Sequence, residues 1–153
     1  MKILLAIDGS DCSKTAVQAV AERPWPAGSQ LKILSVVEPV YLPTTDTWIM
    51  PEKYYAEIDK SAHERAQAAI DYAVEQIDAS DLANLTILTE IREGLAKDII
   101  LEEAEKWRAE LVLLGSHDYR GLKKFLIGSV SNTVAAHAHC SVEIVRKAAG
   151  SRQ

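Results

Sequence analysis

Glycines and hydroxyl side chains gather between residues 115 and 131, in the stretch "GSHDYRGLKKFLIGSVS". Glycine lets the backbone adopt positive φ and approach a ligand closely. The stretch ends where a helix is expected to begin, and unpaired N–H groups at a helix N-terminus favour an anion. Ser129 and Ser131 would each add a hydroxyl donor there. The pattern predicts a phosphate-binding loop, although no GKS or GKT sequence follows, so it is not a Walker-type P-loop.

A second candidate position is Asp8, directly after the apolar run of residues 2–7. In open parallel sheets, ligands bind beyond the carboxyl ends of the strands, where the winding direction reverses. Asp8 and the loop from Gly115 both follow buried strands, so this rule selects both. Interpretations without a ligand stay open. Asp8 could cap the first helix or bond the turn, and Ser129 and Ser131 could be ordinary hydroxyls of a helix start.

Strands and helices are expected to alternate along the whole chain. Apolar and β-branched runs predict strands at residues 2–7, 31–37, 84–91, 111–114 and 140–146. Periodic patterns predict helices after residue 10 and at residues 52–78, 94–107 and 129–137, the third of them with Leu95, Ile99 and Ile100 facing inward. Strands that alternate with helices run parallel, so we expect a doubly wound α/β fold with helices on both faces. One domain would span residues 1–147, with a disordered tail at 148–153.

Composition excludes several classes of protein. A net charge of -5 argues against binding DNA or RNA. No apolar run approaches the roughly 18 residues of a membrane helix, and the first run is too short for a secretory signal, so we expect a cytoplasmic protein. Cys12 and Cys140 are expected to be free thiols. The spacing of His137, His139 and Cys140 matches no usual zinc pattern, so no metal site is expected there.

The glycine stretch resembles the motif of the universal stress protein family. Nucleotide-binding members carry G-x2-G-x9-G-[ST] between the fourth strand and the last helix; Gly115 matches the first glycine, Gly128 the third, and Ser129 the hydroxyl. The segments "AIDGS", "LSVVEP" and "CSVEIVR" are also similar to the family, so the resemblance covers nearly the whole chain.

The resemblance implies a strand order of 3-2-1-4-5 and a homodimer formed through the fifth strand. It further implies ATP as ligand, with Mg²⁺ or Mn²⁺. Asp8 would accept hydrogen bonds from the ribose hydroxyls, and the backbone of Val36 would meet the adenine. The residues that would hold ribose and phosphates are Gly115, Gly128, Ser129, Val130 and Ser131. His117 is a further candidate for contact with a phosphate.

Asp118 departs from the motif, because it stands at the second glycine. A carboxylate about 6 Å from a phosphate, at an effective dielectric of about 20, would cost roughly 3 kcal/mol. A bound Mg²⁺, or the nearby Arg120, Lys123 and Lys124, would offset this repulsion.

Two functions are therefore weighed. The first is an ATP-binding regulatory protein of the stress response, acting on an unidentified protein partner. The second is a dimeric interaction module that binds no nucleotide. An enzyme is not expected, beyond slow ATP hydrolysis, because no nucleophile with an adjacent base and no pair of carboxylates is evident.

Overall fold

The computed structural model describes residues 1–39, 52–78, 85–116 and 128–146. Strands and helices alternate as the sequence predicts. The strands are β1 (Lys2–Ile7), β2 (Gln30–Val37), β3 (Thr86–Glu93), β4 (Leu111–Gly115) and β5 (Ser141–Val145). The helices are α1 (Asp11–Ala21), α2 (Glu52–Asp78), α3 (Ala96–Trp107) and α4 (Ser129–His137).

The five strands form one parallel sheet with the order β3-β2-β1-β4-β5, which confirms the expected topology. The chain winds from β1 through β2 to β3 in one direction, and β4 and β5 then extend the sheet on the other side of β1. Ala6 of β1 pairs with Leu34 of β2 and Leu114 of β4, so these three strands end side by side. The winding direction therefore reverses between β1 and β4.

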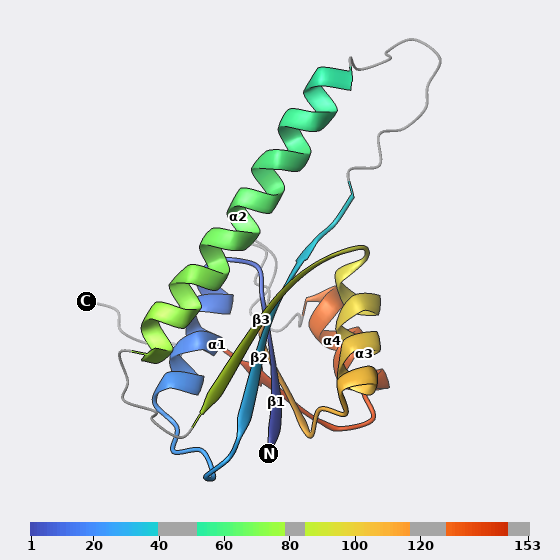
Figure 1. Ribbon diagram of the computed structural model, residues 1–153. Coiled ribbons are helices and arrows are strands. Elements are labelled where there is room, and N and C mark those ends of the chain that lie inside the picture. Colours follow the sequence, from blue (N-terminus) through green and yellow to red (C-terminus); the bar gives the residue numbers. More distant parts are fainter. Residues whose placement is uncertain (40–51, 79–84, 117–127, 147–153) are drawn as a thin grey trace, which may run out of the picture.

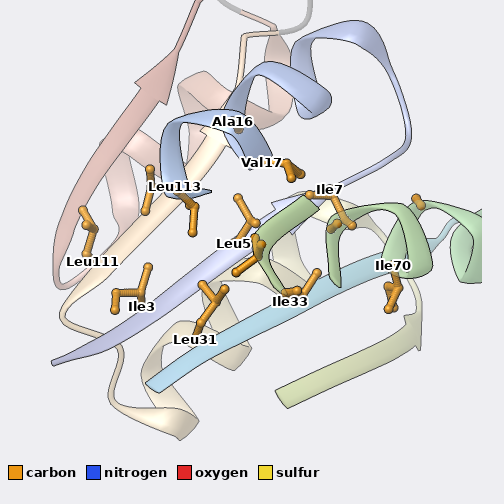
Figure 2. Close-up of a cluster of buried hydrophobic side chains, with 14 residues drawn as sticks. Ile3, Leu5, Ile7, Ala16, Val17, Leu31, Ile33, Ile70, Leu111 and Leu113 are labelled. Carbon is orange, nitrogen blue, oxygen red and sulfur yellow. The ribbon is translucent and has the colours of Figure 1, made fainter. Parts of the chain in front are cut away.

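Helices cover both faces of the sheet, with α1 and α2 on one face and α3 and α4 on the other (Figure 1). Because successive side chains of a strand point to opposite faces, β1 contributes to both cores. Its residues Ile3, Leu5 and Ile7 pack toward α1 and α2, as Figure 2 shows, and Leu4 and Ala6 pack toward α3 and α4. This two-sided burial explains why the run at residues 2–7 lacks polar alternation.

The helix α2 buries only its second half. Ala66, Ala69, Ile70, Ala73 and Ile77 are buried, whereas the first half of the helix rises beyond the sheet (Figure 1). The periodic pattern that predicts this helix therefore corresponds to a buried face from Ala66 onward. No helix within the described ranges combines the length and apolar character that a membrane span needs.

The expected bounds of four strands are wrong by one or two residues, and β2 begins at Gln30 and β4 ends at Gly115. The third strand begins at Thr86 and continues to Glu93, and the fifth strand leaves out Cys140 and Arg146. Leu95 was expected to face inward, but it is the residue before α3 begins and is 44% exposed. Positions next to a helix start do not follow the helical period, and this explains the error about Leu95.

A charged network that the sequence did not predict joins β2, β3 and α3. Lys32 Nζ lies 2.6 Å from Glu103 Oε1 and 3.3 Å from Glu90 Oε2, and Arg92 lies 3.3 Å from the second oxygen of Glu103. The side chain of Glu103 is 3% exposed, so its charge is stable there only because both cations pair with it. Burial acts to lower the pKa of Lys32, but its bonds to Glu103 and Glu90 outweigh burial and raise that pKa.

Candidate functional site

A cleft of about 600 Å³ lies at the carboxyl ends of β1, β2 and β4. The starts of α1, α3 and α4 and the middle of α2 supply its other walls. Every predicted site residue that the structure describes lines this cleft: Asp8, Val36, Gly115, Gly128, Ser129, Val130 and Ser131. The other two, His117 and Asp118, lie outside the described residues, as do Arg120, Lys123 and Lys124.

The turn between β1 and α1 holds Asp8 at the edge of the cleft. Asp8 Oδ1 accepts a hydrogen bond of 2.9 Å from the backbone N–H of Ser10, so Asp8 does bond the turn. Ser10 is the cap of α1, and its Oγ accepts from the N–H of Ser13. Gly9 has φ +78°, a conformation that favours glycine. Asp8 is nevertheless exposed, so the carboxylate lies within reach of a ligand.

Gly115 is required for a reason that the motif did not indicate. A Cβ at this position would lie 2.4 Å from the backbone carbon and oxygen of Cys12 and 2.8 Å from the backbone nitrogen of Ser13. The end of β4 thus packs directly against the first turn of α1. Neither Gly115 nor Gly128 has the positive φ that we expected of loop glycines; among the described glycines it occurs at Gly9, Gly28 and Gly94.

The two serines at the start of α4 differ in their surroundings. Ser131 is 2% exposed, and its hydroxyl donates a 3.0 Å hydrogen bond to the carbonyl oxygen of Gly115. That bond ties the first turn of α4 to the end of β4. Ser129 is exposed, and its hydroxyl makes no hydrogen bond with another described residue. Of these two serines, only Ser129 has a hydroxyl proton that no other described residue accepts.

The N-terminus of α4 presents backbone donors to the cleft. Gly128 occupies the capping position and has no side chain to bond the first amides of the helix. The N–H of Asn132 is the first to bond back into the helix, to Gly128 O at 2.9 Å. The amides of Ser129, Val130 and Ser131 precede it and have no acceptor within the helix. With the helix dipole behind them and no acidic residue in the first turn, they favour an anion.

Sequence reasoning missed the contribution of α2. Ala62, Arg65 and Ala66 of this helix line the cleft, and Arg65 is its one cationic side chain among the described residues. The spacing of four between the two alanines was visible, but it indicated only a buried face. Nothing in the local pattern places that face against the ends of β1 and β2.

Glu38 is a second lining residue that the sequence did not single out. Its Oε1 accepts a 2.9 Å hydrogen bond from the N–H of Ala96, at the start of α3. Leu95 cannot cap that helix with its side chain, so Glu38, which follows β2, does so instead. The carboxylate of Glu38 therefore belongs to the frame of the cleft.

The cysteine and histidines near β5 form no comparable site. His139 and Cys140 border a small separate hollow with residues of α3. Burial raises the pKa of the Cys140 thiol, so it stays protonated and poorly nucleophilic. Within the described ranges, no three His, Cys, Asp or Glu side chains are grouped so that they could hold a metal ion.

A family model described as the universal stress protein family matches residues 1–146. Universal stress protein MJ0531 of Methanocaldococcus jannaschii is 30% identical over 149 residues, which cover 95% of this chain and 82% of the relative. Universal stress protein YxiE of Bacillus subtilis is 30% identical over 148 residues, which cover 95% of this chain and 98% of the relative.

Solved structures share the fold. The hypothetical protein MJ0577 superimposes with a TM-score of 0.77 at 21% identity, covering 97% of both chains. An Arabidopsis thaliana protein of the same family, solved with AMP bound, has a TM-score of 0.69 at 21% identity, covering 97% of this chain and 93% of its own. A universal stress protein solved in complex with cAMP has a TM-score of 0.52 at 21% identity, covering 95% and 96%.

Proposed function

Because the chain belongs to the universal stress protein family, we propose that it is a regulatory protein of the stress response that binds ATP in this cleft. One observation carries the proposal: the free amides of α4 and the carboxylate of Asp8 line the same cleft, at the point where the sheet reverses its winding. The first group suits phosphates and the second suits ribose hydroxyls. The cleft volume of about 600 Å³ is within the usual range for small-molecule sites.

In the proposed complex, the adenine lies against the backbone of Val36, near the end of β2. The carboxylate of Asp8 accepts hydrogen bonds from the ribose. The amides of Ser129 and Val130, with the Ser129 hydroxyl, bind phosphate oxygens. The neighbours solved with AMP and cAMP support an adenine nucleotide as the ligand.

We propose that Mg²⁺ or Mn²⁺ enters with the nucleotide. Among the described residues no cluster of acidic and histidine side chains is available as a cage. Phosphate oxygens and water molecules would then supply most of the ligands, which is usual for Mg²⁺. The cation would also offset the charge of Asp118.

The side chains of the cleft support the proposed regulatory role. Its described lining contains serine hydroxyls but no histidine, lysine or cysteine beside them, and the carboxylates of Asp8 and Glu38 are bonded to backbone N–H groups. Binding would then act as a signal, passed to a protein partner by a homodimer that pairs through β5. Sedimentation at micromolar concentration tests the dimer, and a species with the mass of one chain would contradict it.

A nucleotide-free interaction module is the second candidate, and Asp118 at the second motif glycine favours it. Calorimetric titration with ATP, with and without Mg²⁺, separates the two functions. We expect saturable binding in wild type and none in Gly128→Val, because the added side chain would block a phosphate from the α4 amides. The φ of -56° at Gly128 is one that valine adopts, so the variant should fold.

The matched control is Ala136→Val, which adds the same kind of bulk at an exposed position in the last turn of α4. It should bind ATP as wild type does. ATP binding retained by Gly128→Val would place the nucleotide elsewhere. Absence of binding in wild type, under every metal condition, would leave the interaction module as the function.

A further inference from the structure

Arg65 faces the cleft from the wall formed by α2. It is the only cationic side chain among the described lining residues, which also include the carboxylates of Asp8 and Glu38. Its guanidinium makes no hydrogen bond or ion pair with any other described residue. By contrast, Arg23 and Arg92, neither of which lines the cleft, each pair with glutamate. Among the described lining residues, this cation therefore stands beside two carboxylates with neither of which it forms an ion pair.

Close packing fixes the position of α2 at this point. The Cβ of Ala69 lies 3.5 Å from where a Cβ of Gly9 would be, so the helix rests on the turn that carries Asp8. Ala66 is 7% exposed and Ala62 is half-buried, and both line the cleft. These small side chains leave space between α2 and the strand ends. Arg65, next to Ala66 and exposed, has the length to extend across that space.

We propose that Arg65 binds the phosphate groups of the nucleotide from the side of α2, while the α4 amides bind them from the other wall. This inference rests on the proposed function, since it names a further residue of the same site. The planar guanidinium presents N–H donors in a fork that matches phosphate oxygens. Its positive charge also attracts the phosphates. It offsets the repulsion that the carboxylates of Asp8 and Glu38 and the net charge of -5 exert on a polyphosphate.

The test compares ATP with adenosine, because the two share base and ribose and differ only in phosphates. Replacing Arg65 with glutamine removes the charge but keeps a good helix former at an exposed position, so the fold should be retained. Calorimetry should show ATP bound about tenfold more weakly by Arg65→Gln, as expected for the loss of one charge-assisted pair near solvent. Adenosine affinity should change less than about twofold.

Arg108→Gln is the matched control, since Arg108 is also without an ion pair among the described residues but borders the separate hollow. It should bind both ligands as wild type does. Equal losses of ATP and adenosine affinity in Arg65→Gln would mean that Arg65 contacts the base or ribose, and the inference would be wrong. Unchanged ATP affinity would also overturn it, while leaving nucleotide binding intact. Failure of wild type to bind either ligand would overturn the proposed function as well.

Discussion

At the scale of single residues, Gly115 serves the fold directly. Its missing Cβ lets the end of β4 approach the backbone of Cys12 and Ser13 in the first turn of α1. The carbonyl of Gly115 also accepts the hydrogen bond of Ser131. One residue therefore joins the start of α1, the end of β4 and the start of α4, and these three segments border the cleft.

Gly115→Ala should lower the free energy of unfolding by about 3 kcal/mol, since the new methyl group would overlap backbone atoms that cannot move independently. Urea denaturation followed by circular dichroism measures this change. Gly28→Asn is the control, because Gly28 has φ +76° and no atom within 4 Å of its missing Cβ. Asparagine tolerates that φ, so this variant should lose less than about 1 kcal/mol. Equal losses in the two variants would contradict the packing explanation.

The two serines of α4 should separate stability from binding. Ser131→Ala removes a buried hydrogen bond and should cost about 1–2 kcal/mol of stability. Ser129→Ala removes an exposed hydroxyl and should change stability by less than about 0.5 kcal/mol. ATP affinity should fall several-fold in Ser129→Ala and less in Ser131→Ala. Urea denaturation measures the stability of both variants, and calorimetry measures their affinity for ATP. A larger stability loss in Ser129→Ala and a larger affinity loss in Ser131→Ala would contradict these assignments.

At the scale of elements, α2 is held to the sheet at more than its buried half. His63 precedes the buried stretch of α2, which begins at Ala66. Its Nε2 is 3.1 Å from Glu93 Oε1 at the end of β3. Its Nδ1 lies 3.0 Å from the carbonyl oxygen of Asp59 and 3.5 Å from the carboxylate of that residue. The bond to the Asp59 carbonyl, together with the two carboxylates, raises the pKa of His63 above its ordinary value of 6.5.

This link should depend on pH with a definite sign. Because the pKa of His63 is higher in the folded chain, its stabilising contribution is complete below pH 6.5 and is lost as pH rises through the folded value. His63→Gln should therefore lower the urea midpoint more at pH 5.5 than at pH 8.5. Glu93→Gln, which removes the partner on β3, should show the same trend. If the decrease in urea midpoint relative to wild type were the same at pH 5.5 and pH 8.5 in each variant, this link between His63 and Glu93 would be ruled out.

At the scale of the whole molecule, an ion pair joins the first helix to the last strand. Arg23 lies just after α1, and its two terminal guanidinium nitrogens donate hydrogen bonds of 2.9 and 2.7 Å to the carboxylate of Glu143 in β5. These bonds from Arg23 lower the pKa of Glu143 below its ordinary value of 4.5. The pair supports β5, which lies at the end of the sheet and is the strand proposed to form the dimer.

Glu143→Gln should cost about 0.5–1 kcal/mol at pH 7, a small amount because both side chains are more than a third exposed and water screens the pair. With a lowered folded pKa, the contribution is present above pH 4.5 and is lost as pH falls through the folded value. The difference in urea midpoint between wild type and variant should therefore shrink toward pH 3. Glu75→Gln, at an exposed position in α2, should show no difference at either pH. A difference for Glu143→Gln that persists at pH 3 would contradict this account.

The amino-acid sequence alone determined the order of the elements and the α/β class. Apolar runs such as residues 2–7 indicate buried strands, and turn residues such as Gly9 indicate where the chain reverses. Both are local patterns, so they can be interpreted without knowing which elements become neighbours. For the same reason the sequence could select Asp8 and Ser129 as candidate site residues, because Asp8 directly follows a strand and Ser129 begins a helix. The strand order came from the family resemblance, since no local pattern specifies which strands become neighbours.

Only the tertiary structure decided what the remaining residues do. It placed Arg65 in the cleft, used the hydroxyl of Ser131 for the fold, and paired the buried Glu103 with two cations. Each of these roles depends on an element distant in sequence. Periodicity along the chain records how deeply a side chain is buried, but it carries no information about which atoms surround it, because that is set when whole faces of helices and strands pack together.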